Sequence, residues 1–217
     1  VVLAMDRGGF VGADGPTHHG LFDFAFLRTV PNIVVMAPKD ENELQHMLKT
    51  AVTCDCPVSL RYPRGKGVGA ALDEKVQAIP IGKGEIVFDP PEAALAIVAI
   101  GACVYPALAA AELLQAEGIS VRVINARFVK PLDAELLCAA AKLNRIITVE
   151  ENNLIGGFGS AVLELFMEKG LIGVTVRRLG IPDEFAQHAT QKELRRIYGI
   201  DTEGIAAAVR EMMGSGL

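Results

Sequence analysis

Residues 95–100 have the sequence LAIVAI, six apolar residues in unbroken succession. A strand with one face in water would alternate apolar and polar residues, so this run predicts a strand that is buried on both faces. A helical pattern follows over residues 105–117 and ends at Gly118, the residue type that most often terminates a helix. A doubly buried strand followed by a helix indicates a parallel sheet with helices against both faces.

The same alternation of apolar runs and helical patterns continues toward the C-terminal end. Further strands are predicted at residues 119–124, 146–149 and 174–179, and further helices at residues 132–143 and 159–169. Thr190 and Glu193 have the spacing of a capping box, which predicts a helix through Tyr198 before a last helix at residues 202–213. We expect right-handed crossovers and, for this half of the chain, a complete core of its own.

Toward the N-terminal end the elements are shorter. Asp40 and Glu43 lie at capping spacing at the start of a helical pattern that runs to residue 53. Apolar runs predict strands at residues 1–5, 33–36 and 58–62, and a short amphipathic helix is predicted at residues 21–28. Residues 63–80, rich in glycine, alanine and charge, are interpreted as a linker, after which a new strand begins at Glu85.

The order of elements predicts an α/β protein with two parallel-sheet, three-layer domains, residues 1–80 and residues 81–217. The first five residues already have the pattern of a buried strand, without a polar lead-in. We therefore expect the first domain to be incomplete and upstream sequence to have been removed.

Composition narrows the classes of partner. The chain has 217 residues, 51% of them hydrophobic, and a net charge of -5. This mild acidity, without a Lys/Arg run, gives no reason to expect nucleic acid. No apolar run approaches the roughly 20 residues of a membrane span. The sequence Cys54-Asp55-Cys56 is too tight for zinc, so we expect no metal site and interpret all four cysteines as reduced thiols of a cytoplasmic protein.

Polar groups gather in two loops that follow predicted strands. Residues 6–20, DRGGFVGADGPTHHG, combine several glycines with Arg7, Asp14, His18 and His19. Glycines allow a backbone to approach a ligand closely, and titratable groups beyond a buried strand are typical of a site. Residues 61–65, RYPRG, place two arginines where they could bind a phosphate. The alternative interpretations are a long polar turn for residues 6–20 and a solvated loop for residues 61–65.

A third glycine-rich turn, EENNLIGGFG at residues 150–159, could in principle bind a phosphate at a helix N-terminus. It lacks the third glycine of the dinucleotide fingerprint, and two glutamates precede it, so a structural turn is the favoured interpretation. His46 and His188 have no metal-ligand companion and are interpreted as structural.

These segments together resemble one known family. The stretches DRGGFVGADGPTHHGLFDFAFLR, APKDENEL and RYPRG resemble the pyrimidine-binding domain of 1-deoxy-D-xylulose-5-phosphate synthases. The stretches VAIGACVYPALAAAELL, VINARFVKPLD, TVEENNLIGGFGSAVLE and GIPDEF resemble the C-terminal domain of the same family. The likeness covers almost the whole chain, which is similar to the C-terminal portion of these enzymes.

The resemblance implies a homodimeric, cytoplasmic transferase that condenses pyruvate with glyceraldehyde 3-phosphate, releases CO₂ and opens the non-mevalonate isoprenoid pathway. It also implies that Arg7 and Arg64 bind the acceptor's phosphate, while Asp14 and His18 line the reaction centre. Thiamine diphosphate and Mg²⁺ are held by upstream parts of the family's chain, so no cofactor or metal ligand is expected here. We expect this chain alone to bind no thiamine diphosphate, to be inactive, and to have a mobile glycine-rich loop.

Two other functions remain open at this stage. The chain could be part of another thiamine enzyme of the same fold, a transketolase or a 2-oxo-acid dehydrogenase β-subunit. Alternatively, it could be a non-catalytic dimerisation module, because residues 85–217 show no catalytic cluster of their own.

Overall fold

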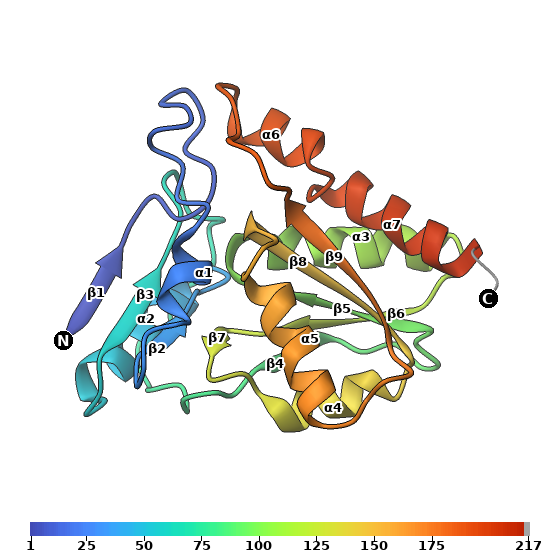
Figure 1. Cartoon of the computed structure of the whole chain (residues 1–217), viewed down its shortest axis with the longest axis horizontal. Coiled ribbons are helices and arrows are strands. Elements are labelled where there is room, and N and C mark those ends of the chain that lie inside the picture. The colour runs from blue at the N-terminus through green and yellow to red at the C-terminus, as the bar shows by residue number, and fades with distance from the viewer. Residues whose placement is uncertain (215–217) are drawn as a thin grey trace.

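The computed structural model describes residues 1–214 and contains two sheets that lie side by side (Figure 1). The four-stranded sheet has the order β1 (Val2–Met5), β3 (Val58–Arg61), β2 (Val34–Met36) and β7 (Phe128–Lys130). The five-stranded sheet has the order β4 (Glu85–Phe88), β6 (Val121–Asn125), β5 (Leu95–Ala99), β8 (Arg145–Asn153) and β9 (Thr175–Ile181).

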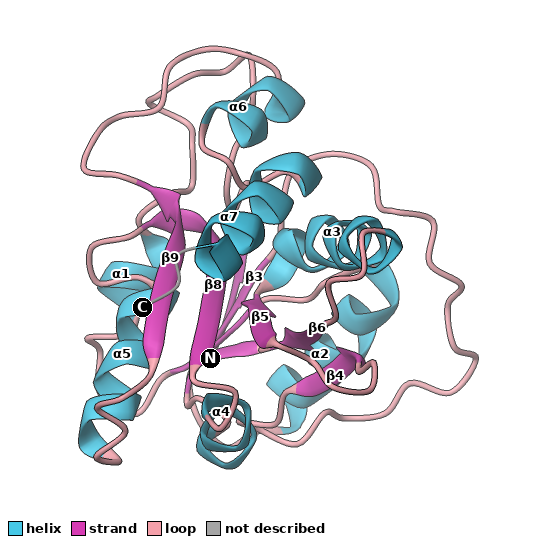
Figure 2. Ribbon diagram, turned by 90° about the vertical axis from the view of Figure 1, so that its right-hand side faces the viewer, coloured by secondary structure: helices cyan, strands magenta, loops and turns pink. Residues whose placement is uncertain are grey.

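Helices alternate with these strands and cover the sheets, as a second view shows (Figure 2). They are α1 (Asp23–Leu27), α2 (Glu41–Thr53), α3 (Val104–Ala116), α4 (Ala134–Ala141), α5 (Phe158–Glu168), α6 (Gln191–Ile197) and α7 (Thr202–Gly214), with a short 3₁₀ turn, η1 (Gly101–Cys103), before α3. Both predicted N-caps are confirmed. The Asp40 side chain accepts a hydrogen bond from the Glu43 backbone at 2.7 Å, and Thr190 and Glu193 form a capping box.

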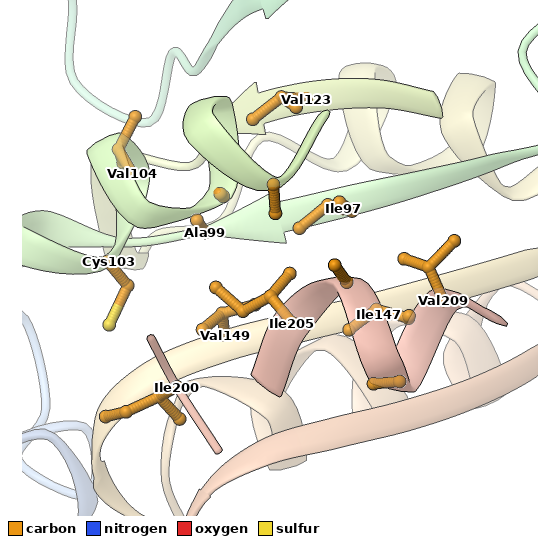
Figure 3. Packing of buried hydrophobic residues seen from close by; sticks show 14 of the residues in the cluster. Ile97, Ala99, Cys103, Val104, Val123, Ile147, Val149, Ile200, Ile205 and Val209 are labelled. Carbon is orange, nitrogen blue, oxygen red and sulfur yellow. The ribbon is translucent and has the colours of Figure 1, made fainter. Parts of the chain in front are cut away.

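Strand β5 is buried on both faces, as its unbroken apolar run predicts. Ile97 and Ala99 pack on one side with Val123 and Val149, against α3 and α7 (Figure 3). The alternate residues of β5 pack on the other side, against α4 and α5. Successive side chains of a strand point to opposite faces of the sheet, so this central strand contributes alternate residues to the two core layers.

The sheets are not wholly parallel, and the two exceptions are informative. Strand β4 pairs antiparallel with β6 at one edge, and β7, a strand that the sequence did not predict, pairs antiparallel with β2. Strand β7 belongs to the second half of the chain, so this half contributes one strand to the four-stranded sheet. The expectation that the first strand is buried is wrong, since β1 is an edge strand in which Leu3 is 40% exposed.

The hydrophobic core is shared between the two halves. Phe10 and Leu21 belong to the cluster between the five-stranded sheet and α3 and α7. Phe24 and Val35 belong to the cluster on its opposite face. The expectation that residues 81–217 have a complete core of their own is therefore wrong, because the first half supplies aromatic and aliphatic side chains to both layers.

The linker is tied along α2. The Glu41 carboxylate accepts hydrogen bonds from the backbone N–H groups of Val68, Gly69 and Ala70 at 3.1, 2.6 and 3.0 Å. His46 continues this line, with its Nε2 at 2.8 Å from Asp73 Oδ2, so the interpretation of His46 as structural is sound. A glycine-rich segment that would otherwise be flexible thus has a defined path.

The cysteines differ from the sequence-based expectation. Cys54 and Cys56 form a disulfide, with their Cα atoms 5.4 Å apart, whereas Cys103 and Cys138 are free. The two bridged residues flank one residue at the bend between α2 and β3, which brings their Cβ atoms within bonding reach. The free thiol of Cys103 is buried, and burial raises its pKa above the ordinary range.

Candidate active site

The two predicted loops leave neighbouring strands at the same edge of the four-stranded sheet. Met5 of β1 pairs in register with Arg61 of β3, and the backbone N–H of Gly8 donates to the carbonyl of Tyr62 at 2.9 Å. Arg7 follows with a left-handed backbone, φ 58°, and an exposed side chain. Arg7 lies just beyond the carboxyl end of β1. Ligands of parallel sheets bind at this edge.

Asp14 and Arg64 meet across the two loops. Arg64 Nη1 donates to Asp14 Oδ2 in an ion pair whose side chains are 48% and 31% exposed, respectively. An exposed pair of this kind contributes little to stability. Its guanidinium retains further N–H donors, so the geometry leaves Arg64 able to bind an anion.

The two adjacent histidines have different roles. His18 is exposed, and its Nδ1 lies 3.0 Å from Thr17 Oγ1. His19 is buried, its Nδ1 accepts from the Val11 backbone at 3.1 Å, and its Nε2 lies 3.4 Å from the carbonyl of Gln187. His18 can therefore reach a ligand, whereas His19 holds the loop.

The second half of the chain supports the glycine-rich loop. Phe10 is fully buried and stacks on Tyr198 with 5.5 Å between ring centroids. Gln191 Nε2 donates to the carbonyl of Phe10 at 2.6 Å and to that of Arg64 at 3.0 Å. In Figure 1 the loop accordingly lies beside α6. Contacts within this chain therefore anchor both loops, and the expected mobility of the glycine-rich loop stays a prediction.

Arg61, one of the two arginines that the sequence offered for a phosphate, is instead buried and bonded within the protein. Only 4% of its side chain is exposed, and its Nε donates to Asp23 Oδ2 at 2.9 Å. Its Nη2 donates to the carbonyls of Gly20 and Glu151, both at 2.8 Å, and its guanidinium carbon lies 4.2 Å from the Phe24 ring centroid. The sequence contained only a weak signal of this role, because Arg61 is the last residue of β3, a short strand that also contains Ser59.

A cavity of about 500 Å³ opens beside Arg64, between the two halves. Tyr62 and Arg64 line it from the first half, and Tyr105 and Arg195 from the second. The Tyr105 hydroxyl donates to Asp40 Oδ2 at 2.9 Å, and burial together with this carboxylate raises the pKa of Tyr105 to about 12. The cavity therefore joins cationic and hydroxyl groups in one concave surface.

The third glycine-rich turn does not leave a helix N-terminus free for a phosphate. The Glu150 carboxylate accepts from the backbone N–H of Phe158 at 2.6 Å and from that of Gly159 at 2.8 Å, at the first turn of α5. Burial raises the pKa of Glu150 to about 7, and the two N–H groups oppose that shift. A side chain of the chain itself thus takes the donors that a nucleotide would need.

The crevice of the five-stranded sheet is also filled. The order of its parallel strands reverses at β5, where ligands commonly bind. There Gly101 has a φ of +59°, and a Cβ on it would lie 3.2 Å from the Cβ of Ala37 in the first half.

Among residues 1–214 no group of three His, Cys, Asp or Glu side chains could hold a metal ion. No helix in that range is long and apolar enough to cross a membrane.

Family models locate both halves. Residues 82–205 match the transketolase C-terminal domain, and residues 1–68 match the transketolase pyrimidine binding domain. The chain belongs to the transketolase family. The predicted fold class is thereby confirmed, with an α/β transketolase C-terminal domain preceded by a partial pyrimidine binding domain.

Relatives within the transketolase family are close in sequence. The chain is 60% identical over all 217 of its residues to the 1-deoxy-D-xylulose-5-phosphate synthase of Syntrophus aciditrophicus, of which it covers 33%. It is 58% identical over 214 residues, 98% of its length, to 1-deoxy-D-xylulose-5-phosphate synthase 1 of Geobacter metallireducens, of which it covers 34%. The chain spans about a third of the length of these curated relatives.

Solved transketolase structures are similar along almost the whole chain. A split-gene transketolase described as an inactive β4 tetramer has a TM-score of 0.82 and 32% identity over 97% of this chain and 65% of that chain. A transketolase of Campylobacter jejuni has a TM-score of 0.73 and 20% identity over 97% of this chain and 31% of that chain. The second likeness concerns the fold alone.

Proposed function

We propose that this chain is the C-terminal third of a 1-deoxy-D-xylulose-5-phosphate synthase, a transferase that condenses pyruvate with glyceraldehyde 3-phosphate and releases CO₂. The observation that carries the proposal is the 60% identity along the whole chain to a relative of that name. The domain boundary at residues 80 and 81, a homodimer and a cytoplasmic location belong to the same proposal.

The arginines at the strand ends supply the acceptor site. Arg7 and Arg64 leave β1 and β3, whose last residues are in register, and both side chains are exposed. Guanidinium groups hold phosphate oxygens through charge-assisted hydrogen bonds. We assign these two residues to the phosphate of glyceraldehyde 3-phosphate, with Asp14 orienting Arg64 through their ion pair.

His18 has the chemistry of the proton donor. The aldehyde oxygen of the acceptor gains negative charge as the new carbon–carbon bond forms, and a protonated imidazole can donate a proton at that atom. His18 is exposed in the same loop as Asp14, so it can face a substrate held by Arg64. His19 cannot serve, because both its ring nitrogens face backbone groups.

The cofactor implied by the family, thiamine diphosphate with Mg²⁺, does not fit the residues of this chain alone. The described residues contain no donor set for the metal that would neutralise the diphosphate. We assign the diphosphate and Mg²⁺ to the part of the synthase outside this chain. The similar split-gene transketolase is described as inactive, and we expect inactivity of this chain by itself.

The test is the acceptor and donor preference of the complete protein. A synthase should release CO₂ from pyruvate only when glyceraldehyde 3-phosphate is present. A transketolase would instead use a ketose phosphate as donor without releasing CO₂, and a 2-oxo-acid dehydrogenase would transfer its acyl group to a lipoyl carrier. Either of these results would replace the proposal.

A further inference from the structure

Four charged side chains lie at the boundary between the two halves of the chain, and one of them, Arg61, bonds across it. Arg61 donates to the Asp23 carboxylate and to the Glu151 carbonyl, at 2.9 and 2.8 Å. Arg195 Nε donates to Glu151 Oε1 at 2.8 Å. We call Asp23, Arg61, Glu151 and Arg195 the clamp. The first two come from the pyrimidine binding half and the last two from the C-terminal domain.

The glycine-rich loop, residues 6–20, rests directly on the clamp. A Cβ on Gly8 would lie 2.4 Å from Arg61 Nε, and a Cβ on Gly9 would lie 2.1 Å from Glu151 Oε2. Gly9 also has a φ of +84°, a conformation that favours glycine. At the far end of the loop, Arg61 holds the carbonyl of Gly20 at 2.8 Å. Both ends of the loop are therefore positioned by buried charges.

Glu151 and Asp23 of the clamp each have a buried carboxylate oxygen, Oε2 and Oδ1 respectively, without a hydrogen-bond partner among the described residues. Glu151 is 1% exposed. An unsatisfied buried carboxylate oxygen is costly, so its retention calls for a reason beyond packing. Glu151 Oε2 is the atom that a Cβ on Gly9 would meet first, and Gly9 lies two residues after Arg7, whose φ is 58°.

We infer that Glu151 and Arg195 of the C-terminal domain are positioning residues for the acceptor site, acting on Arg7 through Gly8 and Gly9. Arg195 holds the Glu151 carboxylate in place, and this carboxylate determines the position of the Gly9 backbone. The position of Gly9 in turn determines the direction in which the chain at Arg7 leaves β1. This inference rests on the proposed function only in naming the phosphorylated acceptor. The placement of the loop is independent of it.

The first arm of the test uses the 217-residue chain and needs no activity. Arg195→Gln should shift the backbone amide NMR signals of Arg7, Gly8 and Gly9, whereas Arg196→Gln, an exposed neighbour on the same helix, should leave them unchanged. Gly9→Ala alters no charge and should shift the same signals. Unchanged loop signals in folded Arg195→Gln protein would overturn the inference.

The second arm uses the complete synthase. Arg195→Gln and Gly9→Ala should raise the KM for glyceraldehyde 3-phosphate by about tenfold to a hundredfold, as a misplaced binding group does, with the KM for pyruvate within about twofold. Glu151→Gln, which does not line the cavity beside Arg64, should give the same split. Arg195→Lys, which keeps the charge, should recover part of the loss.

The outcomes distinguish the positioning role of Glu151 and Arg195 from the proposed synthase function. Equal effects on both substrates, or an effect of Arg195→Gln that neither Glu151→Gln nor Gly9→Ala shares, would overturn the positioning role and leave the synthase assignment intact. If the unaltered complete protein does not condense the two substrates, the proposed function fails, and the NMR arm alone decides whether the C-terminal domain positions the loop.

Discussion

The Glu150 carboxylate lies 2.6 Å from the backbone nitrogen of Phe158 and caps the first turn of α5 from inside the protein. Because burial outweighs these hydrogen bonds, the pKa of Glu150 is raised from 4.5 to about 7. The folded protein thus binds a proton on this group more tightly than the unfolded chain does.

This linkage predicts a pH dependence of stability. The stabilising effect of the raised pKa is fully present below about 4.5 and is lost as the pH rises to about 7. The slope from this group can reach at most about 1.4 kcal/mol per pH unit. Glu150→Gln should remove that slope from plots of unfolding free energy against pH, measured by urea denaturation. As a control, Glu168→Gln, which replaces an exposed carboxylate at the other end of α5, should leave the slope unchanged. Parallel curves for Glu150→Gln and the unaltered chain would contradict the prediction.

The adjacent histidines should separate catalysis from stability. In the complete synthase, His18→Ala should lower turnover and leave both the affinity for thiamine diphosphate and the melting temperature nearly unchanged, since the side chain is exposed. His19→Ala should destabilise the protein by about 1–3 kcal/mol, because the Val11 N–H loses its buried acceptor. Turnover, cofactor titration and thermal unfolding check this pair. A large loss of cofactor affinity in His18→Ala would contradict the assigned role.

Arg64→Ala in the complete synthase should discriminate between the two substrates. Loss of a charge-assisted contact costs about 1.5–3 kcal/mol, and only the acceptor has a phosphate. The KM for glyceraldehyde 3-phosphate should therefore rise far more than that for pyruvate in steady-state assays. Lys49→Ala, which removes an exposed cation from α2, serves as the control. A similar rise for both substrates would argue against Arg64 as a phosphate ligand.

The isolated 217-residue chain should not bind thiamine diphosphate with Mg²⁺ and should have no synthase activity. The described residues provide no metal donor set, so the most highly charged part of the cofactor has no partner. Isothermal titration with the cofactor and Mg²⁺ measures this directly. Micromolar binding by the chain, free of any upstream fragment, would mean that the cofactor site has been misplaced.

The sequence by itself determined several of the local elements. The unbroken apolar run at residues 95–100, the cap at Asp40 and the capping box at Thr190 depend on neighbours within a few positions, so local rules suffice for them. The motifs around Arg7 and Arg64 likewise indicated the two loops to which we assign the acceptor site.

Only the tertiary structure decided what those loops rest on. Arg61 bonds to Glu151, 90 residues away, and Gln191 bonds to Phe10 across 181 residues. The pairing of β7 with β2 and the sharing of both cores also join distant segments. A buried charge takes its partner from whichever side chain the packing brings near, and no period or spacing along the chain records that choice.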